Sequence, residues 1–127
     1  NGMKRFMLSV ALSCLYLANI NAADIKAISG AFSKGNAAAL SSLMDKEVDM
    51  ALQGGTSKVR SGSDAVKDLE SFFKSGNISG FQVIHHADKK DRGFIVGKIN
   101  ANGKEYRVNI TYRTENDKAI IQSIRIE

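Results

Sequence analysis

The segment IVGKINANGKEYRVNITYR (residues 95–113) decides the fold of this chain. Apolar and polar residues alternate on both sides of Asn102 and Gly103, and a period of two is typical of strands with one buried face. Asn-Gly is the strongest short signal for a hairpin with a two-residue turn. Because this turn pairs Ala101 with Lys104, it predicts the register of both strands along their whole length.

The hairpin register predicts one apolar face and one polar face. Four pairs fall on the apolar inner face: Ile99 with Tyr106, Gly97 with Val108, Ile95 with Ile110, and Gly93 with Tyr112. The other face of the second strand carries Arg107, Asn109, Thr111 and Arg113. A slip of one residue in the pairing of the strands would exchange the two faces, so the separation of apolar from polar side chains supports this register.

Two further strands extend the hairpin into a meander. Residues 81–88 are expected to enter it through a three-residue loop at 89–91, and residues 118–126 to leave it through a three-residue loop at 115–117. These loops place two more sets of side chains on the inner face, namely Phe81, Val83, His85 and Ala87, and Ile120, Gln122, Ile124 and Ile126.

Helical periodicity precedes the meander. Ile25, Ile28 and Phe32 recur at three to four residues, which is typical of one face of a helix. Asp24 is a suitable N-cap for it. A second, short helix is expected over residues 36–45.

A third helix follows a short hairpin. Residues 48–62 predict two strands around a Gly-Gly turn, and residues 63–77 predict a helix that ends at Gly76-Asn77. The resulting order is α-α-β-β-α-β-β-β-β. Helices grouped before a long antiparallel meander predict an α+β fold, with the N-terminal helices packed on a curved antiparallel sheet.

The first 22 residues have the layout of a secretory signal. Residues 1–2 precede the first methionine and are interpreted as a cloning remnant. Lys4 and Arg5 then lead into an apolar run that is shorter than the about 20 residues needed to span a membrane. We therefore expect a signal peptide over residues 3–22 and a single domain over residues 23–127, exported to the periplasm or the cell exterior.

Two alternatives to this interpretation stay open. A buried N-terminal helix would give the same apolar run. Cys14 in ALSC stands where a lipoprotein signal carries its lipidated cysteine, although Ala11 and the apolar segment after Cys14 weaken that match.

The composition of residues 23–127 narrows the function. These residues contain no cysteine, which excludes disulfides, thiol catalysis and cysteine metal sites. Removal of Lys4 and Arg5 lowers the net charge from +5 to +3, and no basic block remains. We therefore expect no nucleic-acid partner, no cofactor and no membrane span in the mature chain.

The chain has two histidines, His85 and His86, which are adjacent. Successive residues of a regular strand point to opposite faces, so we expect His85 to face inward and His86 to face outward. The pair then cannot hold one metal ion unless a β-bulge intervenes, and no acidic cluster supplies further ligands. His85 is either a core histidine with a hydrogen-bond partner or a candidate general base.

A ligand pocket is predicted where polar side chains interrupt the inner face. His85 and Gln122 end the expected row, and Gly97 leaves space or lets the sheet bend. An apolar surface with a few polar groups is typical of ligand sites. The residues expected to line this pocket are His85, Gln122, Tyr106, Tyr112, Ile95, Ile110, Gly97 and Phe72.

The segment ISGAFSKGNAAALSSLMDKEVDMAL (residues 28–52) reads as a helix, a Gly-Asn break, a second helix and a strand. With the element order, it resembles the nuclear transport factor 2-like superfamily, also called cystatin-like or SnoaL-like, over about residues 23–127. More narrowly, the chain is similar to small exported bacterial proteins of unknown function. The resemblance implies a cone-shaped sheet cupped by helices.

The catalytic pattern of that superfamily does not carry over. Members such as ketosteroid isomerase place an acidic base in the cone, whereas no Asp or Glu is expected here on the inner face of the long strands. Asp49 lies on an early strand whose facing the sequence leaves open. Enzyme activity is therefore not the favoured interpretation.

Three functions remain open from the sequence. The first is a non-catalytic exported domain that binds a small apolar ligand or a protein partner through the cone. The second is a small isomerase or dehydratase-like enzyme with His85 as its base. The third is a structural module that forms a homodimer through the sheet, because Phe94 and Val96 fall on the otherwise polar face.

Overall fold

Residues 24–127 are described by a computed structural model of the chain. The expected cloning remnant, the signal peptide, its cleavage site and Cys14 lie outside the described residues. Within them, the helices are too short or too polar to cross a membrane.

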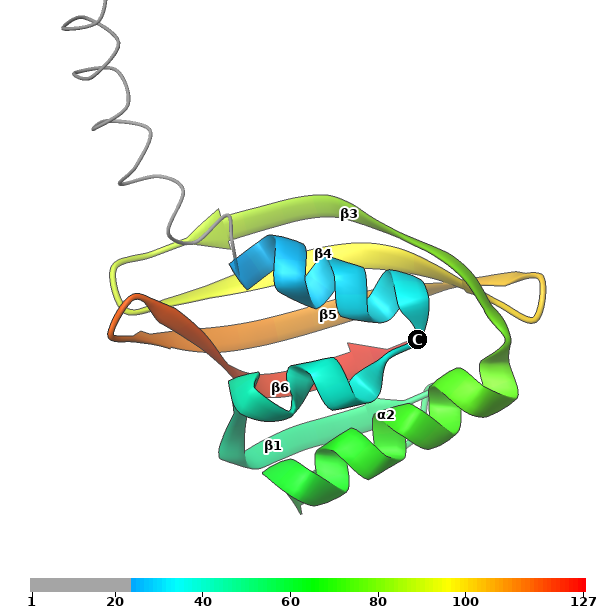
Figure 1. Ribbon diagram of the computed structural model, residues 1–127, viewed down its shortest axis with the longest axis horizontal. Helices are drawn as coiled ribbons and strands as arrows, with labels where there is room; N and C mark the ends of the chain where they lie inside the picture. Colours follow the sequence, from blue (N-terminus) through cyan, green and yellow to red (C-terminus); the bar gives the residue numbers. More distant parts are fainter. Residues whose placement is uncertain (1–23) are drawn as a thin grey trace, which may run out of the picture.

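The described residues form three helices and one six-stranded sheet (Figure 1). The elements in chain order are a helix over residues 24–34, the 3-10 helix η1 (Ala37–Leu43), β1 (Met44–Leu52), β2 (Lys58–Ser61), α2 (Gly62–Gly76), β3 (Ile78–Asp88), β4 (Arg92–Ala101), β5 (Lys104–Glu115) and β6 (Lys118–Ile126). The strands lie in the order β2-β1-β6-β5-β4-β3, with β1 and β6 parallel and all other neighbours antiparallel. The predicted α+β class and element order are confirmed.

All three helices cover one face of the sheet, which we call the inner face (Figure 1). Ile28 and Phe32 from the first helix and Leu69 from α2 pack there against strand residues such as Ile95, and these side chains are 0–1% exposed. Burying each large apolar side chain stabilises the fold by about 1.5–3 kcal/mol. No charged side chain is buried among residues 24–127.

The β4–β5 hairpin has the predicted register. Asn102 and Gly103 have φ values of 54° and 74°, as a type I′ turn requires, and Ala101 pairs with Lys104. Every pair named from the sequence follows, through to Gly93 opposite Tyr112. The Asn102 side chain also donates a hydrogen bond to the carbonyl of Ser75 at 3.0 Å, which attaches the turn to the end of α2.

The predicted facing of His85 and His86 is wrong because β3 contains a bulge. Val83 pairs with Gly97 as expected, but the next pair is His85 with Val96, so one extra residue, Ile84, enters the strand. A bulge reverses the facing of every residue beyond it. His85 therefore lies on the outer face.

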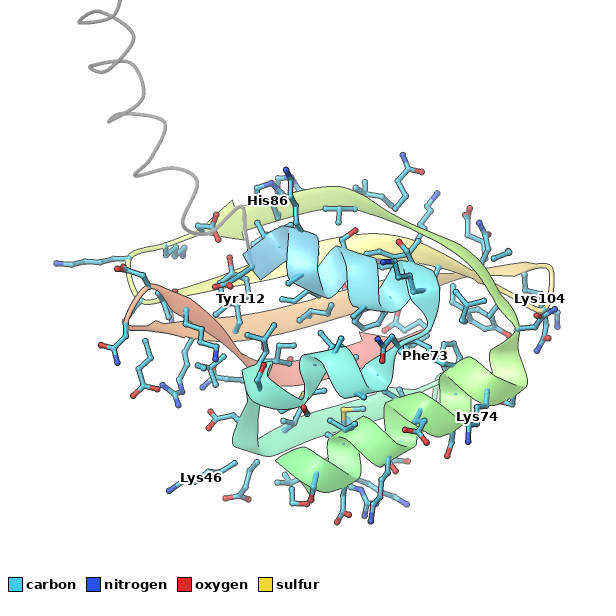
Figure 2. The ribbon with its side chains drawn as sticks, in the orientation of Figure 1. Lys46, Phe73, Lys74, His86, Lys104 and Tyr112 are labelled. Carbon is cyan, nitrogen blue, oxygen red and sulfur yellow. The ribbon has the colours of Figure 1, made fainter. Side chains whose placement is uncertain are left out.

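His86 takes the place expected of His85 but is not enclosed. It pairs with the buried Ile95, yet its side chain is 47% exposed and lies 3.9 Å from the carboxylate of Asp88. In Figure 2 the His86 side chain projects from β3 away from the body of the molecule, whereas Tyr112 and Phe73 lie within it.

The predicted facing of Ile120 and Gln122 is also wrong. The loop before β6 has two residues, Asn116 and Asp117, with φ values of 51° and 62°, and not the three expected over residues 115–117. Tyr112 consequently pairs with Ile121, and a shift in register then inserts Gln122 as an extra residue. Gln122 is exposed. The shift restores the expected parity, so Ile124 and Ile126 face inward as predicted.

Smaller differences concern the ends of elements. The second helix is a 3-10 helix that ends at Leu43, so Met44 opens β1 instead of closing the helix. The helix α2 begins at Gly62, because the hydroxyl of Ser61 caps it by accepting a hydrogen bond from the Asp64 N–H at 3.2 Å. Its predicted end is confirmed by Asn77, which adopts the left-handed conformation.

The contact between Gly97 and Phe81 can be tested with one methyl group. A Cβ at Gly97 would lie 2.6 Å from Cζ of Phe81 and 2.8 Å from the backbone oxygen of Gln82. Gly97→Ala should lower the free energy of unfolding by about 1–3 kcal/mol, measured by urea denaturation.

The matched control is Gly30→Ala, on the first helix, where a Cβ would meet nothing within 4 Å. Alanine has a higher helix propensity than glycine, so the free energy of unfolding of this variant should rise by up to about 1 kcal/mol. A Gly97→Ala protein as stable as the parent would show that Phe81 does not occupy this space.

Candidate functional site

The residues predicted to line a pocket do not all gather around one cavity, although Tyr112 and Gln122 both line a groove of about 230 Å³. Phe72, Ile95, Ile110 and Tyr112 are buried on the inner face, and Tyr106 is partly buried, with its ring edge-on to Phe72 at 6.1 Å. His85 and Gln122 lie on the outer face because of the two bulges. The expected row therefore does not exist.

Aromatic rings fill the space that the inner-face glycines leave. The ring of Phe81 lies over Gly97, and the hydroxyl end of Tyr112 lies over Gly93. Both tyrosines point inward as predicted, but they belong to the packing of the core. Aromatic side chains that cover glycine in a neighbouring strand are a known way of supporting a bent sheet.

The inner face offers little chemistry to a substrate. The Tyr112 hydroxyl is its one buried side-chain polar atom without a hydrogen-bond partner among the described residues. No carboxylate or imidazole is buried beside it within residues 24–127. A hydroxyl without a neighbouring acid or base is a poor proton-transfer group near neutral pH.

Residues 24–127 also contain no group of three His, Cys, Asp or Glu side chains close enough to hold a metal ion. His85 has an aromatic neighbour instead of a carboxylate, because its ring centre lies 5.6 Å from that of Phe94. His85 and Phe94 therefore contact each other across β3 and β4.

The outer face of the sheet carries the large apolar side chains that the fold leaves exposed. Within the described residues these are Val59, Ile84 and Phe94, at 65%, 52% and 36% exposure. Val59 pairs with Asp49, which lies between the inward-facing Val48 and Met50, so Val59 faces outward. Phe94 lies likewise beside the inward-facing Ile95.

Ile84, His85, Phe94 and Val96 are neighbours on the outer face of β3 and β4, and we call them the β3–β4 patch. Ile84 and Val96 line a groove of about 410 Å³ together with the basic residues Lys98 and Arg107 and the acidic residues Glu105 and Glu127. Lys98 and Glu105 form an ion pair at 3.2 Å. An apolar centre with a rim of mixed charge is typical of protein-binding surfaces.

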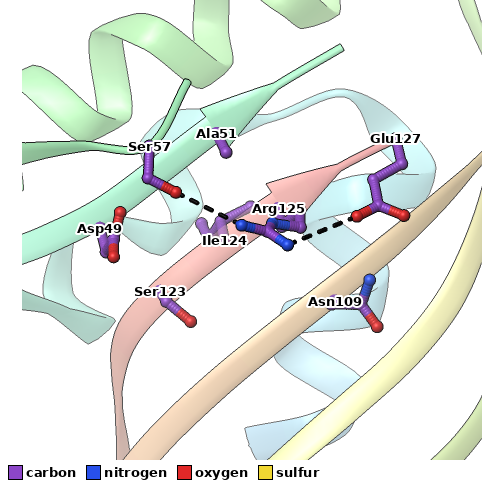
Figure 3. Close-up of a pocket in the computed structure, with 8 residues that line it drawn as sticks. All are labelled: Asp49, Ala51, Ser57, Asn109, Ser123, Ile124, Arg125 and Glu127. Carbon is purple, nitrogen blue, oxygen red and sulfur yellow. Dashed lines mark hydrogen bonds and ion pairs between the residues drawn. The ribbon is translucent and has the colours of Figure 1, made fainter. Parts of the chain in front are cut away.

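A polar groove of about 260 Å³ lies on the same face (Figure 3). It adjoins the patch because Asn109, which lines it, pairs with Val96. Its lining consists of Asp49, Ala51, Ser57, Asn109, Ser123, Ile124, Arg125 and Glu127. The Arg125 guanidinium contacts the Ser57 hydroxyl at 3.4 Å and the Glu127 carboxylate at 3.6 Å. Both contacts are long, and both charged side chains are about half exposed.

An ion-pair network holds the far end of the outer face. Arg113 donates to Asp45 at 3.1 Å and to Glu115 at 2.9 Å, which ties β5 to the start of β1 across β6. The Arg113 hydrogen bond, aided by the N–H of Lys46, holds the pKa of the Asp45 carboxyl below its ordinary value despite partial burial. The hydrogen bond to Asp45 raises the pKa of Arg113 in return.

Some outer-face residues could have been found from the sequence and others could not. The outward facing of Phe94 and Val96 follows from the hairpin register and is confirmed. The outward facing of Val59 was not predicted, although the sequence places this residue in a short strand after a Gly-Gly turn. Nothing in the sequence marked His85 and Gln122 as outer-face residues.

Comparisons with known proteins agree with this fold. The model of a family described as a domain of unknown function, DUF4783, matches residues 25–127. A search of the curated proteins found no match.

Solved structures of the same family are similar. A DUF4783 family protein from Bacteroides uniformis is 27% identical, with a TM-score of 0.75 over 80% of this chain and 94% of its own. Another from Bacteroides fragilis is 30% identical, with a TM-score of 0.73 over 79% of this chain and 93% of its own. An NTF2-like protein of unknown function from Cytophaga hutchinsonii, 15% identical over 81% of this chain and 84% of its own, has a TM-score of 0.57 and shares the fold. The expected NTF2-like fold is confirmed.

The Asp45–Arg113 ion pair should make stability depend on pH. A carboxylate whose pKa is lower in the folded protein stabilises it above the unfolded-state value of about 3.9, and this stabilisation disappears as the pH falls through the folded-state pKa. Asp45→Asn should therefore lower the free energy of unfolding at pH 6, and the difference from the parent should shrink below about pH 4.

The measurement is urea denaturation of both proteins from pH 6 to pH 2.5. Asp49→Asn is the matched control, since Asp49 lies on the same strand and the same face without an ion pair in residues 24–127. An Asp45→Asn deficit of equal size at every pH would contradict the role given to Arg113.

Proposed function

The chain belongs to the DUF4783 family, and we propose that it is a non-catalytic domain that binds a protein partner with the outer face of its sheet. One observation carries the proposal: the large apolar side chains exposed within residues 24–127 share that face. Exposed apolar clusters of this kind mark contact surfaces in soluble proteins.

The interior of the cone supports this choice of surface. A small apolar ligand bound there would have to displace the Phe81 ring from Gly97 or the Tyr112 ring from Gly93. Cores are close-packed, and such a displacement costs free energy that a ligand must first recover. The outer face needs no such rearrangement.

The position of His85 also argues against the enzyme alternative. His85 was its candidate, and it lies on the exposed face beside Phe94. A general base works best in a site that excludes water and orients the imidazole. No carboxylate is paired with His85 in the described residues.

The charges around the β3–β4 patch favour protein over nucleic acid as the partner. Lys98 and Arg107 are accompanied by Glu105 and Glu127 in the same groove. Nucleic-acid sites need a basic surface that displaces counterions from phosphates. We expect the partner in the periplasm or at the cell exterior, where the signal-like N-terminal segment would direct the chain.

Photocrosslinking in the native host tests this surface directly. A benzophenone side chain placed at Phe94 should yield covalent protein adducts on irradiation, because it lies at the centre of the proposed contact. The same group at Lys67, an exposed position on α2, should yield none.

Both variants should first be shown to have the melting temperature of the parent, so that adducts report contact and not unfolding. Adducts at Lys67 but not at Phe94 would place the contact on the helices. An absence of adducts from both positions would remove the proposed function.

A further inference from the structure

The groove of about 230 Å³ that Tyr112 and Gln122 line lies at one end of the outer face, beside the turn that joins β3 to β4, and we call it the turn groove. Figure 1 shows this turn and the β5–β6 turn at the same end of the sheet, away from the β4–β5 turn. One row of paired residues borders the groove, since Ala87 pairs with Phe94 and Phe94 pairs with Thr111. Paired residues in a sheet share a face.

The lining of the turn groove is largely apolar. The Phe94 ring is 36% exposed there, and Ala87 lies opposite it on β3. Gly93 adds no side chain, and the stems of Lys89 and Arg92 supply methylene groups. A hollow with an exposed aromatic ring and few polar groups suits the hydrocarbon part of a small molecule.

The charged residues that line the turn groove are both cations. They are Lys89 and Arg92, and neither side chain forms an ion pair within residues 24–127. Asp88 and Asp91 belong to the same turn but are not among the lining residues, and Asp88 lies 3.9 Å from His86 instead. Two cations without a carboxylate beside them attract an anion.

The other two grooves of the outer face differ in this respect. The groove of about 410 Å³ contains Glu105 and Glu127 together with its two cations. The groove of about 260 Å³ contains Asp49 and Glu127 together with Arg125. Carboxylates would repel an anion in both. Of these three grooves, the turn groove is therefore the one whose lining is both apolar and positively charged.

We infer that the turn groove binds a small amphipathic anion, namely an organic acid whose hydrocarbon part packs on Phe94 and whose carboxylate meets Arg92 and Lys89. Arg92 offers a planar fork of N–H donors to two carboxylate oxygens, and Lys89 offers a single ammonium group. Drug-sized sites measure about 300–1,000 Å³, so this smaller groove suits an acid with one ring or a short chain. The inference goes beyond the proposed function and does not depend on it.

Three probes that share one hydrocarbon part and differ in head group test this site. Phenylbutyrate carries a carboxylate, phenylbutanol is neutral, and phenylbutylamine is a cation at neutral pH. Each is titrated into the purified, isotope-labelled chain while amide NMR shifts are recorded. The acid should bind saturably and shift the amides of Gly93, Phe94 and Thr111. Phenylbutanol should bind roughly three- to tenfold more weakly, and phenylbutylamine more weakly still.

Variants that remove one positive charge separate the head-group contact from the apolar contact. Arg92→Gln and Lys89→Gln should each weaken phenylbutyrate binding by roughly threefold and leave the affinity for phenylbutanol unchanged. Lys90→Gln is the matched control, because Lys90 is exposed on the same turn and does not line the groove. This control should bind the acid as the parent does. Melting temperatures show that each variant is folded.

Four outcomes would overturn the inference. The first is no saturable shift with phenylbutyrate at millimolar concentration, and the second is equal affinity for the acid and the alcohol. The third is an equal loss in Lys90→Gln and Arg92→Gln, which would mean a general attraction to the turn and not a site. The fourth is a set of shifts centred on Ile95 and Ile110, which would place the acid in the cone. None of these outcomes affects the photocrosslinking result, so the proposed function is tested separately.

Discussion

The β4–β5 hairpin is the constraint on which the rest of the structure depends. Its turn at Asn102 and Gly103 sets Ile95 opposite Ile110, and this register puts these two residues, with Ile99 and Val108, under the helices. The two neighbouring strands pair with this hairpin, and β1 pairs with β6. The same register turns Phe94 and Val96 outward, so the buried core and the exposed patch have one common cause.

The parts of the fold that follow from local chemistry could be predicted. Apolar residues at helical spacing, residues that end helices and the Asn-Gly turn each act over a few residues. The order of the elements follows from them. The bulges at Ile84 and Gln122 could not be predicted in this way. Each bulge bends its strand and increases the local twist, and it is defined by the pairing with a neighbouring strand that is distant in sequence or joined by a turn, not by the residues of the strand itself.

The two bulges explain why the candidate site moved from one face to the other. Each reverses the facing of one polar residue that a regular strand would have buried, namely His85 on β3 and Gln122 on β6. Burial without a partner would cost each of them free energy. The β3 bulge replaces His85 by His86, which stays 47% exposed, and Gln122 at the β6 bulge is exposed. The core is then packed with the Phe81 and Tyr112 rings over glycine. The contact surface that we propose is therefore the outer face.

The facing of His85 is the most direct test of this account, and nuclear Overhauser contacts of its ring in the purified protein measure it. We expect contacts from the His85 ring protons to the Phe94 ring, whose centre lies 5.6 Å away, and to the Val96 methyl groups opposite. Contacts to the methyl groups of Ile95 and Ile110 would instead place His85 inside the cone. They would contradict the bulge in β3.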